Sequence, residues 1–260
     1  MALDAATIAK LAEHIEKAEL EAFDVTKITD DHPAMTIAEA YQVMEAIRDA
    51  KLARGIRQVG YKMGLTSRAK MVQMGVDKPG YGLLFDYFAV EDGGVIDTKK
   101  LIHPKVEAEI AFVTKAPLKG PGVHIGNVLA ATDFVLPALE IIDSRYRDFK
   151  FDMVSVIADN SSSCRFVTGG RSRDVSEVDL KTLGLVMEKN GQPVGLSCGA
   201  AVLGHPAASV AMLANMLGAK GEELPAGSFI MTGGVTAAVA VEAGDTVTVH
   251  YQDLGSISVS

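Results

Sequence analysis

The chain has 260 residues, 48% of them hydrophobic, so it can bury a substantial core without disulfides. A formal net charge of −8, with no lysine- or arginine-rich block, argues against nucleic acid or an anionic membrane surface as the main partner. Two cysteines, Cys164 and Cys198, make no disulfide framework, and no apolar run reaches the roughly 18–20 residues that span a bilayer. Because the N-terminus also does not resemble a signal peptide, we expect a cytoplasmic protein.

The N-terminal part predicts two helices. Apolar residues recur at helical spacing over residues 5–20. Thr36 and Glu39 fit a capping box, in which each side chain satisfies a free backbone N–H at the start of a second helix. Gly55 is placed to end that helix after Arg54.

From Gln58 onward the pattern is mostly that of strands. Residues 67–74 predict a short helix, Lys78 to Gly82 a turn, and Asn190-Gly191 a tight hairpin. Strands are predicted over residues 58–65, 108–114, 134–142, 183–189, 193–198, 228–232 and 246–251, with a helix over 206–217. Helices followed by a mostly β body indicate an α+β fold. We divide the chain into an N-terminal helical segment with the first strand, residues 1–70, and a β body, residues 71–260.

Two glutamates lead into the apolar strand predicted over residues 108–114. Glu107 and Glu109 are two residues apart, so their side chains project to the same side of a sheet. Carboxylates this close repel each other unless a cation or a proton lies between them. Taken alone, the pair more often lies on a solvated face or edge, and that alternative stays open here.

A third glutamate lies inside an apolar strand. Glu140 falls within residues 134–142, where a carboxylate is rarely buried without a partner. That partner could be Arg145 or a lysine. If the two strands are neighbours, however, Glu107, Glu109 and Glu140 converge on one point, and three hard oxygen ligands suit Mg²⁺ or Mn²⁺ better than zinc.

These segments, taken together in order, resemble the fumarylacetoacetase superfamily. The likeness rests on Glu107-Ala108-Glu109, Glu140, Asp143-Ser144-Arg145, Lys62 to Ser67, Ala158 to Ser161, Asn190-Gly191 and Met231 to Gly234. Within the superfamily the chain is similar to the branch of 2-hydroxypentadienoate hydratases and 4-oxalocrotonate decarboxylases. The resemblance implies a mixed β-roll body of the fumarylacetoacetase C-terminal-domain type with an N-terminal helical segment. It also implies that the three glutamates hold Mg²⁺ or Mn²⁺.

The resemblance further assigns the substrate side of the site. It implies a small 2-oxo dicarboxylic acid whose 2-oxo-carboxylate end faces Lys62, the catalytic residue, and Ser161. A structural carboxylate could equally pair with Lys62. For Ser161, a hydrogen bond from the hydroxyl to local backbone is the more common arrangement in such a loop. Thr232, before Gly233-Gly234, and Leu83, in an apolar wall, are further candidates to line the substrate pocket.

Two reactions fit this branch. A hydratase needs a positioned acid or base, which an Asp-Phe-Gly run supplies in the hydratases; here Gly80 takes the aspartate's place, and Asp86 is out of register. Decarboxylation of 2-oxo-3-hexenedioate needs no such base, because the departing carboxylate belongs to a vinylogous β-keto acid. We therefore expect a decarboxylase of the meta-cleavage pathway that forms 2-hydroxypenta-2,4-dienoate. The alternatives are a hydratase and a non-catalytic scaffold subunit. Hydrolysis ranks third, because neither His14 nor His32 fits a His–Glu pair.

The resemblance also implies partners. Homo-oligomers are expected, as is a complex with the 2-hydroxypentadienoate hydratase that consumes the dienol product. No nucleic acid and no membrane is expected to bind.

Overall fold

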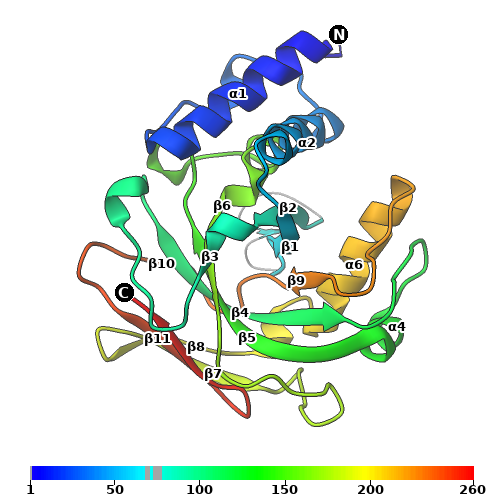
Figure 1. Cartoon of the computed structure of the whole chain (residues 1–260), viewed down its shortest axis with the longest axis vertical. Helices are drawn as coiled ribbons and strands as arrows, with labels where there is room; N and C mark the ends of the chain where they lie inside the picture. The colour runs from blue at the N-terminus through cyan, green and yellow to red at the C-terminus, as the bar shows by residue number, and fades with distance from the viewer. Residues whose placement is uncertain (1, 68–70, 73–77) are drawn as a thin grey trace.

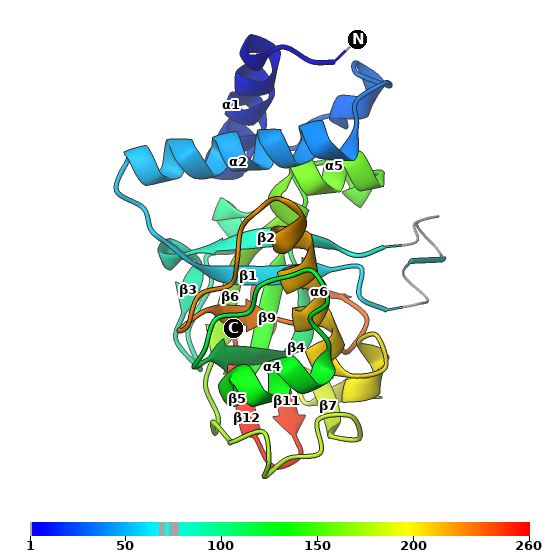
Figure 2. The ribbon, with the colours of Figure 1, turned by 90° about the vertical axis from the view of Figure 1, so that its right-hand side faces the viewer.

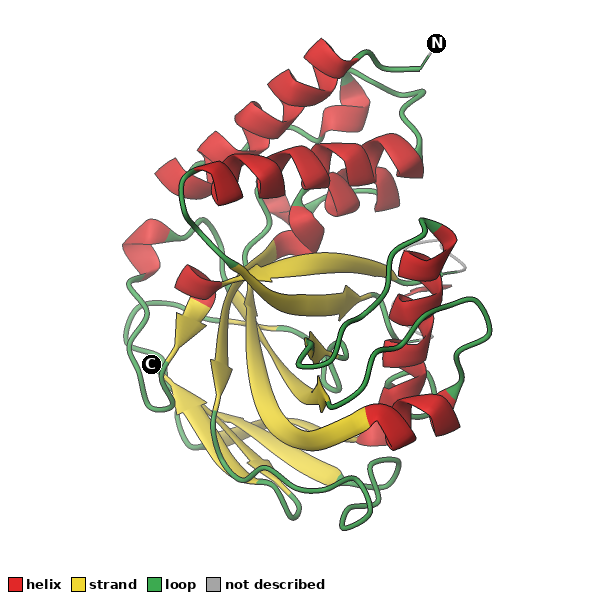
Figure 3. Cartoon of the chain, turned by 45° about the vertical axis from the view of Figure 1, so that its right-hand side comes forward, coloured by secondary structure: helices red, strands yellow, loops and turns green. Residues whose placement is uncertain are grey.

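A pair of N-terminal helices lies over one end of a strongly curved sheet (Figures 1 and 2). The structure is a computed structural model that describes residues 2–67, 71–72 and 78–260. Within the described residues, the α-helices are α1 (Ala5–Glu21), α2 (Ile37–Ala53), α4 (Ile125–Ala131), α5 (Met153–Ala158) and α6 (Pro206–Ala219). α5 lies between α2 and the sheet, whereas α4 and α6 flank the body from outside (Figures 2 and 3).

The two predicted N-terminal helices are confirmed, with the predicted cap. The Thr36 side chain accepts a hydrogen bond from the Glu39 backbone N–H, and Glu39 reaches back to the backbone N–H of Thr36. Gly55 follows the helix with φ +84°, a conformation that glycine adopts without strain. Lys51 of α2 is fully buried and lies 3.1 Å from Glu16 of α1, so an ion pair joins the two helices.

The main sheet holds eight strands in the order β2-β1-β9-β4-β5-β6-β3, with β10 paired to β4. Its strands are β1 (Gln58–Gly64), β2 (Gly80–Phe85), β3 (Ala89–Val90), β4 (Lys105–Thr114), β5 (Thr132–Ile142), β6 (Ser163–Thr168), β9 (Phe229–Met231) and β10 (Val239–Ala240). The sheet is mixed, because β1 runs parallel to β9 and antiparallel to β2. It curls into a half-barrel (Figure 3).

A second, antiparallel sheet closes the body in the order β12-β11-β7-β8. Its strands are β7 (Gly184–Lys189), β8 (Gln192–Cys198), β11 (Val247–Tyr251) and β12 (Gly255–Val259). The predicted hairpin between β7 and β8 is confirmed, since Asn190 and Gly191 have φ values of +54° and +74°. The α+β class and the mixed β-roll body are confirmed. The division of the chain at residue 70 stays a prediction.

The predicted turn over Lys78 to Gly82 is wrong, because β2 already begins at Gly80. Glycine serves close packing here: a Cβ on Gly82 would lie 2.6 Å from the backbone oxygen of Asn160. The predicted helix over 67–74 lies largely outside the described residues. The short strands β2, β3, β6, β10 and β12 and the helices α4 and α5 were not predicted, because each has too few residues for a clear period.

One apolar segment is longer than the sequence pattern suggested. Residues Gly199–Ala219, which include α6, are long and apolar enough to cross a bilayer. Half of that segment's apolar window is buried inside the protein, as in a helix that packs on a protein core. On α6 itself Val210 and Leu213 are fully buried.

Candidate metal centre

Three glutamates from two neighbouring strands come together in the concave side of the main sheet. β4 pairs antiparallel with β5, and the register places Glu107 directly opposite Glu140. Glu109 lies two residues further along β4 on the same face. One carboxylate oxygen of each residue lies within 4.8 Å of the others. All three are buried, Glu109 and Glu140 completely. The predicted convergence of the two strands is confirmed.

Burial and mutual repulsion shift the acidities of these groups. Desolvation, and then the charge of Glu140, raise the pKa of Glu109 well above its ordinary value. Desolvation also raises the pKa of Glu140, against the opposing charge of Lys62. Oε1 of Glu109 and Oε1 of Glu140 have no hydrogen-bond partner among the described residues. A buried carboxylate oxygen without a donor calls for a cation or a proton.

The donor set fits a hard divalent cation. Three carboxylates without a sulfur or imidazole ligand suit Mg²⁺ or Mn²⁺ and leave coordination positions for water or a chelating substrate. Zinc prefers sites that include cysteine or histidine. The unpartnered oxygens of Glu109 and Glu140 point to the same conclusion.

Lys62 of β1 contacts the glutamate cluster of β4 and β5 through Glu140. Its Nζ lies 3.1 Å from Oε2 of Glu140, an ion-pair contact without full hydrogen-bond geometry. It also donates a hydrogen bond of 2.9 Å to the backbone oxygen of Ser161. The expected alternative that Arg145 pairs with Glu140 is wrong, because Arg145 pairs with Asp159. A lysine does pair with Glu140, and it is Lys62.

A strained turn presents Ser161. Asn160, Ser161 and Ser162 have φ values of +50°, +53° and +57°, which non-glycine residues rarely adopt. The Asn160 side chain holds the turn against β2, because it accepts from Leu83 N at 2.7 Å and donates to Leu83 O at 2.9 Å. The Ser161 hydroxyl donates to Tyr81 O rather than to local backbone.

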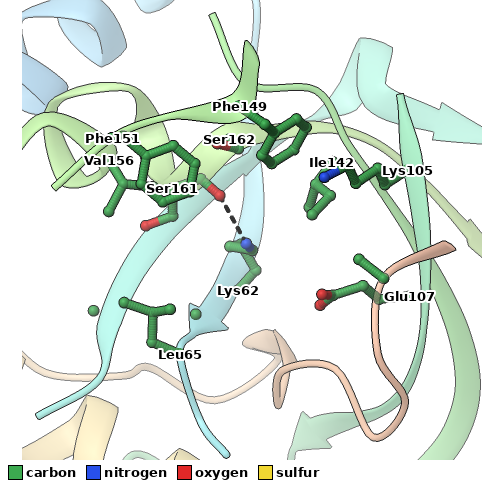
Figure 4. A pocket seen from close by; sticks show the side chains of 13 residues that line it. Lys62, Leu65, Lys105, Glu107, Ile142, Phe149, Phe151, Val156, Ser161 and Ser162 are labelled. Carbon is green, nitrogen blue, oxygen red and sulfur yellow. Dashed lines mark hydrogen bonds between the residues drawn. The ribbon is translucent and has the colours of Figure 1, made fainter. Parts of the chain in front are cut away.

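A cavity of about 270 Å³ opens over these groups. Lys62, Ser161 and Glu107 line it together, as Figure 4 shows. Its other described lining residues are Gly64, Leu65, Gly80, Lys105, Ile142, Phe149, Phe151, Val156, Ser162 and Ala238. Glu107 is the one acid among the described lining residues, so they offer no second carboxylate to activate a water molecule.

Two residues predicted to line the substrate pocket are not among the residues that line this cavity. Leu83 is buried, and its backbone positions Asn160. Thr232 is buried as well and donates its hydroxyl to Ile110 O at 2.8 Å. Asp86 pairs with Arg57, away from the cavity.

The apolar wall of the cavity comes from residues that the sequence pattern did not identify. Phe149, Phe151 and Val156 form it, in place of the predicted Leu83. Phe149 ends a short 3-10 helix (Arg147–Phe149), and Phe151 lies in the loop that follows, so no periodicity marks a buried face. The N-cap Asp152 before α5 was the one local signal in this region.

The Gly233-Gly234 pair explains how the backbone fits so close to the glutamates. Gly233 N donates a hydrogen bond of 2.6 Å to Oε2 of Glu109. Gly233 has φ +100°, and a Cβ there would overlap the Thr66 hydroxyl. A Cβ on Gly234 would overlap the carboxylate of Glu107.

Comparison with known proteins agrees with this geometry. Residues 86–260 match the family described as fumarylacetoacetate (FAA) hydrolase, C-terminal. A 4-oxalocrotonate decarboxylase from Pseudomonas sp. (strain CF600) is 67% identical over 95% of this chain and 94% of its own length. A 2-hydroxyhexa-2,4-dienoate hydratase from Comamonas testosteroni is 41% identical over 89% of each chain.

A solved structure matches along nearly the whole chain. It is 4-oxalocrotonate decarboxylase from Pseudomonas putida G7, complexed with magnesium and adipate. The TM-score is 0.98 at 63% sequence identity, and the match covers 99% of this chain and 98% of that one.

Proposed function

This chain belongs to the fumarylacetoacetate hydrolase family, and on that premise we propose that it is a Mg²⁺-dependent 4-oxalocrotonate decarboxylase. It converts 2-oxo-3-hexenedioate to 2-hydroxypenta-2,4-dienoate and CO2 in the meta-cleavage degradation of aromatic compounds. One observation carries the proposal: three buried carboxylates converge, and Glu107 of that cluster lines one cavity together with Lys62 and the apolar residues Phe149, Phe151 and Val156. Full-length identity of 67% to a decarboxylase, against 41% to a hydratase, supports the same choice.

Glu107, Glu109 and Glu140 are the residues that hold the cation, with Mn²⁺ as an alternative to Mg²⁺. When bound, the divalent cation supplies a Lewis acid that stabilises negative charge as it develops on the keto oxygen. The carboxylates themselves supply three hard ligands, and their negative charge exceeds that of a divalent ion by one, which Lys62 offsets.

Lys62 binds the 2-oxo-carboxylate end. Its ammonium has three N–H donors, of which one points to Ser161 O and another faces Glu140. The remaining donor is left for an oxygen of the substrate in the cavity, and a proton on Nζ adds positive charge where the dienolate forms. Ser161 and Ser162, held in their strained turn, form the adjacent wall.

The reaction breaks the bond between the distal carboxylate and the adjacent CH2 carbon. The electron pair of that bond passes through the conjugated C=C to the keto oxygen, so no base has to remove a proton first. Phe149, Phe151 and Val156 keep water from part of the cavity. Such a wall favours neutral CO2 over a solvated carboxylate.

Incubation of the purified protein with 2-oxo-3-hexenedioate and Mg²⁺ tests the proposal. We expect release of CO2 together with the absorbance of the dienol, and loss of both with a chelator. Addition of water to 2-hydroxypenta-2,4-dienoate without CO2 release would identify a hydratase instead. A protein that neither turns over nor gains stability from Mg²⁺ would be a scaffold.

We further propose that the enzyme is a cytoplasmic homo-oligomer that associates with a 2-hydroxypentadienoate hydratase. Both cysteines, Cys164 and Cys198, are free thiols, as expected in a reducing compartment. The dienol product is the hydratase's substrate, which gives the association a chemical reason. Size-exclusion chromatography of the chain alone tests the homo-oligomer. The same measurement after co-expression with such a hydratase tests the association, since two independent peaks would rule out a stable complex.

A further inference from the structure

Lys105, which the proposed reaction leaves without a role, lines the same cavity as the metal centre. It begins β4, two residues before Glu107 and on the same face of that strand. Its Nζ lies 3.8 Å from the centre of the Phe149 ring. Lys105 makes no ion pair with any residue that the structure describes, although it is half-buried. Figure 4 shows its side chain beside Ile142, apart from Lys62.

Phe149, the aromatic partner of Lys105, lies in a strained stretch of backbone. Asp148 and Phe149 have φ values of +55° and +58°, and a bulky aromatic residue rarely adopts this left-handed conformation. The Phe149 ring also packs against Phe151, at 5.9 Å between centroids, and against His103, at 5.0 Å. Strain of this kind persists where the surroundings enforce it, which is common at binding sites. The ring therefore holds the ammonium at a defined place at the cavity.

Among the residues that the structure describes, the charges of the site leave Lys105 without a matching carboxylate. Three carboxylates are balanced by a divalent cation together with Lys62, so the ammonium of Lys105 adds one net positive charge. Residues two apart on a strand are roughly 7 Å apart. The carboxylate carbons of a six-carbon diacid are five C–C bonds apart, about 6 Å when extended. The backbone spacing of Lys105 and Glu107 is thus comparable to the length of such a diacid, and both residues line the same cavity.

We propose that Lys105, positioned by Phe149, binds the distal carboxylate and selects dicarboxylic over monocarboxylic 2-oxo acids. The inference rests on the proposed function and names a specificity determinant within the same site. The ion pair stabilises the substrate's carboxylate, and that charge disappears as CO2 forms. Lys105 therefore contributes to binding of the substrate and not to lowering the barrier, so its loss raises KM far more than it lowers kcat.

Paired ligands test this assignment directly. Adipate and hexanoate have the same carbon chain but two carboxylates and one, respectively. In the presence of Mg²⁺, calorimetry with Lys105→Met should show adipate binding weakened by about tenfold or more, while hexanoate changes by less than about twofold. With 2-oxo-3-hexenedioate, KM should rise by a similar factor. Lys105→Arg, which keeps the charge, should retain the preference for adipate.

Lys99→Met is the matched control. It removes the same charge from an exposed lysine of the short helix Thr98–Lys100. Lys99 itself makes no ion pair with the described residues. Phe149→Leu keeps apolar bulk without an aromatic face, and should weaken adipate binding in the same direction but less.

Two results would overturn the assignment. In one, Lys105→Met weakens adipate and hexanoate binding equally; in the other, kcat collapses at unchanged KM. If Lys105→Met does not fold, Phe149→Leu replaces it, and affinities for both ligands equal to those of the wild type would overturn the assignment as well. Absence of CO2 release by the wild type would count against the proposed function alone, because the adipate-to-hexanoate ratio is still measured.

Discussion

Lys62 and Glu140 contact each other across the sheet although their strands are not neighbours. β9 and β4 lie between β1 and β5 in the strand order, yet Lys62 Nζ is 3.1 Å from Glu140 Oε2. Both side chains are buried on the concave side of the curled sheet. The curl therefore creates the charge balance of the site, since a flat sheet would hold strands three positions apart roughly 14 Å from each other.

Replacement of Lys62 by methionine tests that contact. Removing the ammonium leaves Glu140 buried without its counter-charge, so the metal-free protein should lose about 3 kcal/mol of unfolding free energy. Turnover should fall by roughly two orders of magnitude, because the group that faces the 2-oxo end is lost. Urea unfolding in a chelator and kcat with saturating Mg²⁺ measure the two effects. Full activity in Lys62→Met would exclude the role assigned here.

Replacement of Glu109 by glutamine should move metal binding and stability in opposite directions. Mg²⁺ affinity should fall at least about tenfold and CO2 release should be lost, because one hard ligand is gone. The metal-free protein should become more stable by about 1 kcal/mol or more, because one of three repelling charges is removed. Calorimetry and thermal unfolding in a chelator provide the readouts, and Glu107→Gln should likewise lose metal and turnover while it stays folded. An unchanged Mg²⁺ affinity in both variants would place the metal elsewhere.

The acidities of the site predict how pH acts on the metal-free protein. The folded state raises the pKa values of Glu109 and Glu140 above the ordinary value of 4.5, so it keeps protons that the unfolded chain releases. Their contribution to stability is therefore fully present below pH 4.5 and is lost as pH rises through the raised pKa values. The difference in unfolding free energy between the wild type and Glu109→Gln, measured in a chelator from about pH 5 to pH 8, reports the part of this contribution that depends on Glu109. A difference that is constant with pH would contradict the prediction.

Gly233 and Gly244 have similar φ values but different surroundings, so substitutions at the two positions distinguish backbone strain from steric overlap. Gly233 has φ +100° beside the Thr66 hydroxyl and donates to Glu109, whereas Gly244 has φ +92° with open space around it. Gly244→Ala should lose only the conformational cost, about 1 kcal/mol. Gly233→Ala adds a steric overlap, so it should lose several kcal/mol and weaken Mg²⁺ binding. Equal losses in denaturant unfolding would show that close packing at Gly233 is unimportant.

Strong local patterns allowed much of the fold to be predicted. The capping box of Thr36 and Glu39, the Asn190-Gly191 hairpin and the apolar strands of Glu107 and Glu140 were all confirmed, because each depends on residues close in the chain. The glycines of β2 were wrongly predicted to form a turn. Gly82 is there for the approach of Asn160, which lies far away in the sequence.

The sequence by itself determined the set of charged groups. Three glutamates lie on two strands and cannot be buried without a cation or a proton, and a lysine lies on an apolar strand. What only the tertiary structure decided is their arrangement. It paired Lys62 with Glu140, placed Phe149 and Lys105 at the cavity, and buried Leu83 and Thr232 outside its lining. The reason is physical: alternation along a strand fixes which side chains share a face, whereas the curl of the sheet and the irregular loops depend on contacts between distant residues.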